Sequence, residues 1–138
     1  MRILTSLLTA LITASGLAVA TAGSASALGG ETLACRVTPG QVITYKQNCT
    51  NSMGASSYQI SFRIQNETAP STYAWSISSD LLTTVVNGCT STYNYCTLSV
   101  PNADNNVWAS VTLTQNGATE TLTSHAFIGQ YCGTISCR

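Results

Sequence analysis

The chain has 138 residues, six of them cysteine, and its five basic and five acidic side chains together make up only 7% of the sequence. A nucleic-acid-binding protein needs a basic stripe that collects phosphates, and a protein that lies on an anionic membrane needs a polybasic face. Charges of either sign are scattered along this chain, so we expect neither kind of partner.

Residues 1–27 have the pattern of a secretory signal peptide. Arg2 supplies a positive charge, residues 3–20 form an apolar run, and the segment ends in the small residues Ala25-Ser26-Ala27, which signal peptidase accepts. Cleavage after the similar triplet at 20–22 is the second choice. A transmembrane anchor is the main alternative, but threonines and serines dilute the run and no charge cluster follows it. A lipid anchor on Cys35 would leave an odd number of cysteines.

We therefore expect a secreted, extracellular protein that keeps no membrane anchor after cleavage. Its mature part, residues 28–138, suits one domain and is too short for two. All six cysteines lie in this part, so disulfides are expected to brace the domain.

Apolar and polar side chains alternate with the period of two that is typical of strands. In chain order we expect strands at residues 34–38, 42–45, 58–64, 73–77, 81–86, 95–100, 107–113 and 118–128. Pro101 ends the sixth, and Asn116-Gly117 favours a hairpin turn between the last two, because this dipeptide tolerates positive φ angles. No helical period follows residue 27. About seven or eight strands of this spacing predict an all-β, two-sheet antiparallel sandwich.

The strand Tyr73-Ala74-Trp75-Ser76-Ile77-Ser78, together with residues 107–114, resembles the middle and late strands of secreted bacterial immunoglobulin-like (Ig-like) domains of the polycystic-kidney-disease type. The resemblance covers about half of the mature chain, and it implies an Ig-like sandwich in which Trp75 is buried. It also implies a non-catalytic adhesive or recognition role. It carries over no functional residue, and the Asp-Gly turn usual in that family is replaced here by Ser79-Asp80-Leu81.

The cysteines are partly assigned by their spacing. A Cys89–Cys96 bond would clip a short loop and is the easiest to close. The other four allow three pairings, and we expect the N-terminal pair to bond to the C-terminal pair, because the first and last strands of such sandwiches often lie side by side. These four are Cys35, Cys49, Cys132 and Cys137. Each such bond would contribute on the order of 4–5 kcal/mol in the chain-entropy model. The spacing does not match a zinc ribbon, and exported thiols oxidise, so no metal and no cofactor are expected.

Catalysis has little support in the sequence. His125 is the only histidine, no nucleophile-elbow pattern surrounds a serine, and the five carboxylates of the mature chain are isolated from one another. We expect His125 on the solvent face of its strand and no catalytic residue. The protein is therefore predicted not to be an enzyme.

Three surface features are candidates for recognition. Trp108 alternates with core-type residues, so its indole should face outward as a stacking platform for a sugar or as an anchor in a protein interface. The loop between Cys89 and Cys96 presents Tyr93, Asn94 and Tyr95. The turn 101–106 is rich in side-chain oxygens, which calcium favours, but it lacks the spaced carboxylates of a calcium loop, and an ordinary Asx turn is the better explanation.

Two functional hypotheses follow. The first is a secreted, non-catalytic module that binds a cell-surface or wall glycan, or a protein, with Trp108 in the contact. The second is a secreted inhibitor or small effector that acts on a protein through the Cys89–Cys96 loop.

Overall fold

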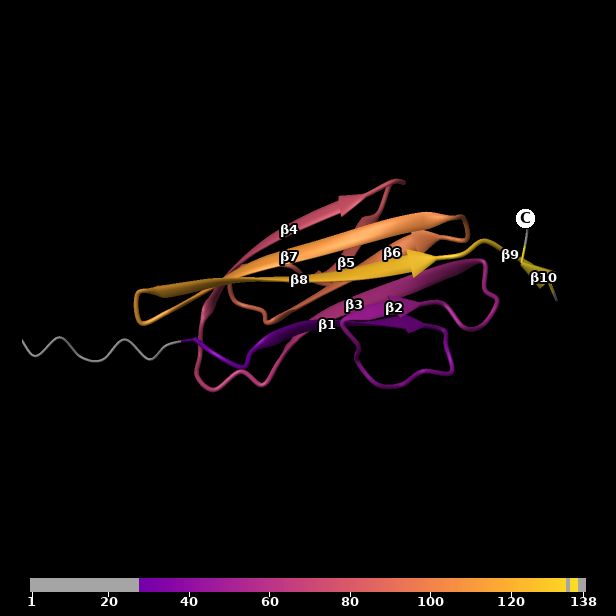
Figure 1. Cartoon of the computed structure of the whole chain (residues 1–138). Coiled ribbons are helices and arrows are strands. Elements are labelled where there is room, and N and C mark those ends of the chain that lie inside the picture. Colours follow the sequence, from indigo (N-terminus) through magenta and orange to yellow (C-terminus); the bar gives the residue numbers. More distant parts are fainter. Residues whose placement is uncertain (1–27, 134, 137–138) are drawn as a thin grey trace, which may run out of the picture.

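Two four-stranded sheets pack face to face as a sandwich (Figure 1). This computed structural model describes residues 28–133 and 135–136; the predicted signal peptide and Cys137 lie outside the described residues. The all-β, two-sheet sandwich predicted from the alternating pattern is confirmed.

The first sheet has the strand order β1-β3-β6-β5 and is antiparallel throughout. The second sheet has the order β2-β8-β7-β4, in which β2 runs parallel to β8 and the other pairs are antiparallel. A short β9–β10 pair follows β8 at one end of the sandwich (Figure 1). The bounds are β1 Thr32–Thr38, β2 Asn48–Thr50, β3 Ser57–Gln65, β4 Thr72–Ser79, β5 Thr84–Gly88, β6 Tyr95–Pro101, β7 Asn105–Gln115, β8 Ala118–Ile128, β9 Tyr131–Cys132 and β10 Ile135–Ser136.

The core lies between the sheets and is filled by every second residue of their strands, as the alternation predicted. Asn116 and Gly117 both have positive φ, as expected for the two-residue turn that joins β7 and β8. The fully buried apolar side chains include Tyr58, Ile60, Phe62, Leu98, Val100, Val107, Val111, Leu113 and Ile128.

Two of the shorter predicted strands are placed differently. The predicted strand at 42–45 is wrong: Val42 and Ile43 are exposed, and the backbone of Lys46 instead makes an isolated bridge with Cys35. The strand near 81–86 begins only at Thr84, because the N–H of Leu81 donates to the Asn105 side chain and holds that residue in a turn. In both cases the apolar residues of an exposed loop gave a sequence pattern that resembles that of a strand.

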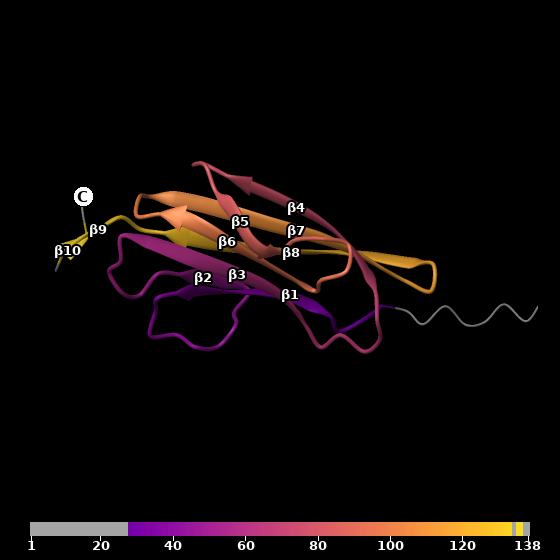
Figure 2. The same cartoon turned by 180° about the vertical axis from the view of Figure 1, so that it is seen from behind.

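The disulfide between Cys89 and Cys96 is present, as predicted. The expected bonds between the two ends of the chain are wrong for Cys35, which is bonded to Cys49. The reason lies in β2, which follows β1 after one loop (Figure 2). It pairs with β8 in the second sheet. Its Cys49 thus comes to 5.9 Å from Cys35, measured between Cα atoms, whereas Cys132 lies beyond the end of β8.

Cys132 is disulfide-bonded as well, and no cysteine among the described residues is free. These bonds indicate an oxidising environment. No helix of the described residues is long and apolar enough to cross a membrane.

The resemblance placed Trp75 in the core, but its indole is only partly buried. β4 is an edge strand of the second sheet, so one side of the ring meets the Cys89–Cys96 loop instead of a neighbouring strand. There the indole N–H donates to the carbonyl oxygen of Tyr93 at 3.1 Å.

Candidate functional site

The outward face of the second sheet carries Trp108. Its neighbours Val107 and Ala109 point into the core, and the indole is therefore turned away from it, with 53% of the residue's surface exposed. The outward position expected for Trp108 is confirmed. An exposed side chain of this size on the middle of a sheet has no role in holding the core together.

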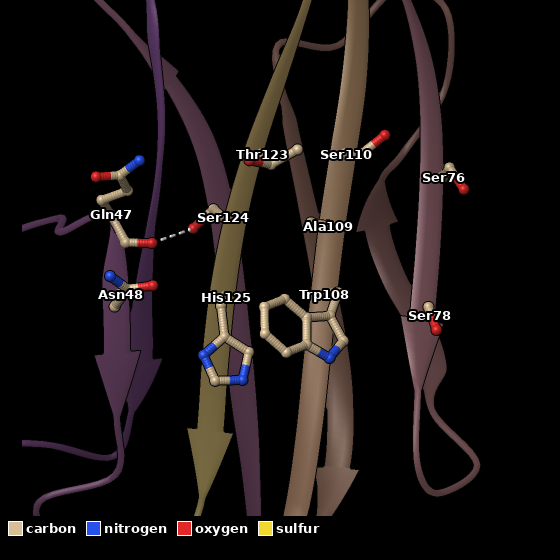
Figure 3. A pocket seen from close by; sticks show the side chains of 10 residues that line it. All are labelled: Gln47, Asn48, Ser76, Ser78, Trp108, Ala109, Ser110, Thr123, Ser124 and His125. Atoms are coloured by element: carbon tan, nitrogen blue, oxygen red, sulfur yellow. Dashed lines mark hydrogen bonds between the residues drawn. The ribbon is translucent and has the colours of Figure 1, made fainter.

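His125 stands directly opposite Trp108 in the β7–β8 ladder. The imidazole and indole rings stack with their centroids 3.8 Å apart and their planes inclined by 25°, and the two side chains lean toward each other in Figure 3. His125 lies on the solvent face as predicted, although the stacking makes it half-buried.

A series of side-chain hydrogen bonds fixes the orientation of the His125 imidazole. Asn106 donates from its side-chain amide to the Asp80 carboxylate at 2.8 Å, so its carbonyl oxygen faces His125 Nε2 at 3.1 Å. The imidazole therefore carries its proton on Nε2 and donates it to Asn106. The amide and backbone N–H groups of Asn106 lower the pKa of Asp80 and keep it ionised.

A shallow groove of about 270 Å³ surrounds the aromatic pair (Figure 3). The strand registers place Asn48, His125, Trp108 and Ser78 in one row across the four strands. Neighbouring strands lie about 4.8 Å apart, so the row spans about 14 Å. We call this the Trp108 groove; its lining is Gln47, Asn48, Ser76, Ser78, Trp108, Ala109, Ser110, Thr123, Ser124 and His125.

The groove is polar except at its aromatic centre. A second row, formed by Ser76, Ser110 and Thr123, runs parallel to the first. The lining offers hydroxyl and amide groups that both donate and accept hydrogen bonds, and it contains no carboxylate, lysine or arginine. Such a surface matches a flat ligand that has an apolar face and many hydroxyl groups.

In the second candidate, the Cys89–Cys96 loop, only some of the three residues predicted to be presented are exposed. Tyr93 is 46% exposed, and its ring centroid lies 5.2 Å from that of the half-buried Tyr95. Asn94 has a structural role: its side-chain amide donates to Glu67 at 3.0 Å, and its backbone carbonyl oxygen accepts from the N–H of Ile64. The loop therefore presents one free aromatic ring.

The oxygen-rich turn 101–106 holds residues 130 and 131, which follow β8, in place. Asn102 exchanges two hydrogen bonds of 2.8 Å with the backbone of Tyr131, and the Asp104 carboxylate accepts from the N–H of Gln130 at 2.7 Å. Within the described residues no cluster of three or more His, Cys, Asp or Glu side chains is arranged to hold a metal ion.

Sequence reasoning found Trp108 but missed its partner. The signal was available, because a two-residue turn at Asn116-Gly117 pairs Gln115 with Ala118 and, counting back, Trp108 with His125. The same register places Asn106 diagonally beside His125, but the further link to Asp80 could not be found this way, because Asp80 belongs to another segment of the chain.

In comparisons with known proteins, no family model matches this chain and no curated protein proves similar to it. The function is therefore argued from the geometry of the site.

Proposed function

We propose that this protein is a secreted, extracellular, non-catalytic module that binds a carbohydrate polymer in the Trp108 groove. The observation that carries the proposal is the exposed indole of Trp108, held by His125 among hydroxyl and amide groups on a rigid sheet. The C–H face of a sugar ring stacks on such an indole, while its hydroxyl groups hydrogen-bond to the polar rows beside it.

The strand order supports an Ig-like assignment of the sandwich. In Ig constant-type domains the strands A, B, E and D form one sheet, and C, F and G form the other. With β1, β3, β4, β5, β6, β7 and β8 as A to G, the orders β1-β3-β6-β5 and β8-β7-β4 correspond to this arrangement. Trp75 then falls on strand C, which carries the tryptophan in that fold.

The composition of the groove favours binding over hydrolysis. Glycoside hydrolysis commonly needs two carboxylates on either side of the scissile bond, and the groove lining contains none. Its one imidazole is held through Nε2 by Asn106, next to the ionised Asp80. We therefore assign His125 the task of positioning Trp108.

Binding of a protein through the Cys89–Cys96 loop is the second candidate function. The observation that favours it is Tyr93, an exposed aromatic ring on a loop that is closed by a disulfide. A pre-ordered loop loses little conformational entropy on binding. On this candidate Tyr93→Ala abolishes activity against the partner, and Trp108→Ala has no effect.

The test is co-sedimentation of the oxidised protein with a panel of insoluble polysaccharides and intact cell walls, with the unbound fraction as the readout. We expect depletion by at least one material, loss of that depletion in Trp108→Ala, and normal depletion in Tyr93→Ala. If Trp108→Ala sediments like the wild type, the groove is not the binding site. If no material depletes the protein, the carbohydrate proposal is wrong.

A further inference from the structure

A second, smaller cavity lies beside the Trp108 groove, at the edge of the sandwich. It has a volume of about 130 Å³ and sits between β1, the loop that follows it and β2. Asn48 lines both the groove and this cavity, so the two adjoin at β2. The cavity lining is Arg36, Val37, Val42, Thr44, Lys46, Asn48, Cys49, Thr50 and Ser52.

The charge of this cavity differs from that of the groove. Arg36 and Lys46 both line it, and its lining contains no carboxylate. They are two of the three basic residues in the part of the chain that the structure describes; the third, Arg63, is exposed on β3 and does not line the cavity. In a chain with so few charges, two cations share one small cavity.

The fold fixes the backbone of Lys46 and the guanidinium of Arg36. The backbone of Lys46 exchanges hydrogen bonds of 2.7 and 3.0 Å with Cys35, whose disulfide to Cys49 ties the same segment to β2. The Arg36 guanidinium lies 5.3 Å above the Tyr45 ring and donates one N–H to the Ile43 carbonyl oxygen at 3.4 Å. A ligand would therefore meet one charge, that of Arg36, which is already positioned, and this lowers the entropy lost on binding. The second charge lies on the exposed side chain of Lys46, whose backbone is fixed.

Two residues that line the cavity have hydrogen-bond donors to spare. The Nε atom of Arg36 is buried and has no hydrogen-bond partner within the described structure. The Ser52 hydroxyl accepts from the N–H of Gln41 at 2.8 Å, so its own proton can be donated elsewhere. A buried donor without a partner is costly, and an anionic acceptor relieves that cost while forming a strong, charge-assisted hydrogen bond.

We propose that this cavity binds an anionic group, a carboxylate or a phosphate, carried by the polymer that lies in the Trp108 groove. The inference rests on the proposed function and narrows its ligand to an acidic glycan. The first row of the groove runs across the four strands from Ser78 on β4 to Asn48 on β2. A polymer bound along this row leaves the sheet at β2, where Lys46 and Arg36 can bind its anionic group. The cavity accommodates one compact anionic group.

The test compares three soluble polymers, two of which share one backbone. Dissociation constants are measured for polygalacturonate, its fully methyl-esterified form and poly(glycerol phosphate). We expect at least one of the two anionic polymers to bind. The polymer that binds identifies the anionic group as a carboxylate or a phosphate. If polygalacturonate binds, the methyl ester should bind about tenfold more weakly, because it lacks the charge that Lys46 and Arg36 receive.

Lys46→Gln removes one cation without disturbing the core, because this side chain is exposed. We expect it to weaken binding of the anionic polymers about two- to fivefold, since an exposed charge is partly screened. Arg63→Gln removes an equal charge outside the cavity and should leave binding unchanged. Raising the salt concentration should reduce the difference between the wild type and Lys46→Gln, because the Debye length falls to about 3 Å at 1 M.

The outcomes separate the two proposals. If neutral polysaccharides bind through Trp108 and the anionic polymers bind no better, or if Lys46→Gln and Arg63→Gln weaken binding equally, the cavity proposal is wrong and the groove proposal stands. If anionic polymers bind and depend on Lys46 while Trp108→Ala has no effect, the cavity is an anion site and the groove proposal is wrong. Binding of no polymer of any kind overturns both.

Discussion

Replacing Trp108 by alanine tests the groove quantitatively. A tryptophan offers about 250 Å² to bury, of which 53% is exposed here, which leaves about 130 Å² for a ligand. If a sugar covers about half of that area, at about 25 cal/mol per Å², stacking contributes about 1.6 kcal/mol. We therefore expect Trp108→Ala to weaken binding of the recognised glycan about 15-fold, measured by isothermal titration calorimetry with a soluble fragment.

The same substitution should cost little stability, because the indole is half exposed and lies outside the core, stacked on His125. Tyr93→Ala is the matched control: it also removes a half-exposed aromatic ring, but on the Cys89–Cys96 loop, and should leave glycan affinity unchanged. An affinity loss of less than twofold in Trp108→Ala, with the fold intact by circular dichroism, would refute the reasoning. An equal loss in Tyr93→Ala would also refute it, because the effect would then not be specific to the groove.

Three further predictions concern the fold. The double variant Cys35→Ala/Cys49→Ala should lose about 3 kcal/mol of unfolding free energy in denaturant titrations, because the wild-type disulfide closes a loop of about 15 residues. An unchanged unfolding midpoint would contradict the pairing. Burial, together with the hydrogen bond to Glu67, raises the pKa of Tyr73 to about 12. A tyrosine in the unfolded chain ionises near pH 10, so this contribution to stability is complete below pH 10 and is lost between pH 10 and 12. The unfolding free energy of the wild type should therefore fall more steeply over that interval than that of Tyr73→Phe, and parallel profiles would contradict this assignment. Asn105→Ala should cost about 1–3 kcal/mol, because this buried side chain accepts the N–H of Leu81, and a loss below 0.5 kcal/mol in the same titrations would show that water replaces it.

Strands that alternate cleanly could be predicted from the sequence, because burial on one face of a sheet imposes a period of two. Residues 58–64 and 107–113 are examples, and their inward side chains form the centre of the core. Residues 42–45 failed because Val42 and Ile43 are apolar yet exposed on a loop. Apolar composition alone does not distinguish an exposed loop of this kind from a short edge strand.

The disulfide pairing shows a second limit. The expectation that the first and last strands lie close was sound, since the sulfur of Cys35 lies 3.3 Å from the carbonyl oxygen of His125 on β8. The pairing was still wrong for Cys35, because β2 brings Cys49 to the same edge. A three-residue strand leaves almost no periodic signal, and yet it decides which cysteine is near.

The candidate site was predictable only in part. The outward direction of Trp108 followed from its neighbours, and His125 follows from the hairpin register. The cation cavity did not, because Arg36 and Lys46 meet through the Cys35 bridge at the edge of the sandwich, and no local pattern encodes that contact.

The most direct test of the central claim is hydroxyl-radical footprinting of the protein bound to the polysaccharide or wall that depletes it, read by mass spectrometry. We predict that bound ligand protects Trp108 and His125 from oxidation and leaves Tyr93 as reactive as in the free protein. Protection of Tyr93 with no change at Trp108 would contradict the account and place the contact on the Cys89–Cys96 loop.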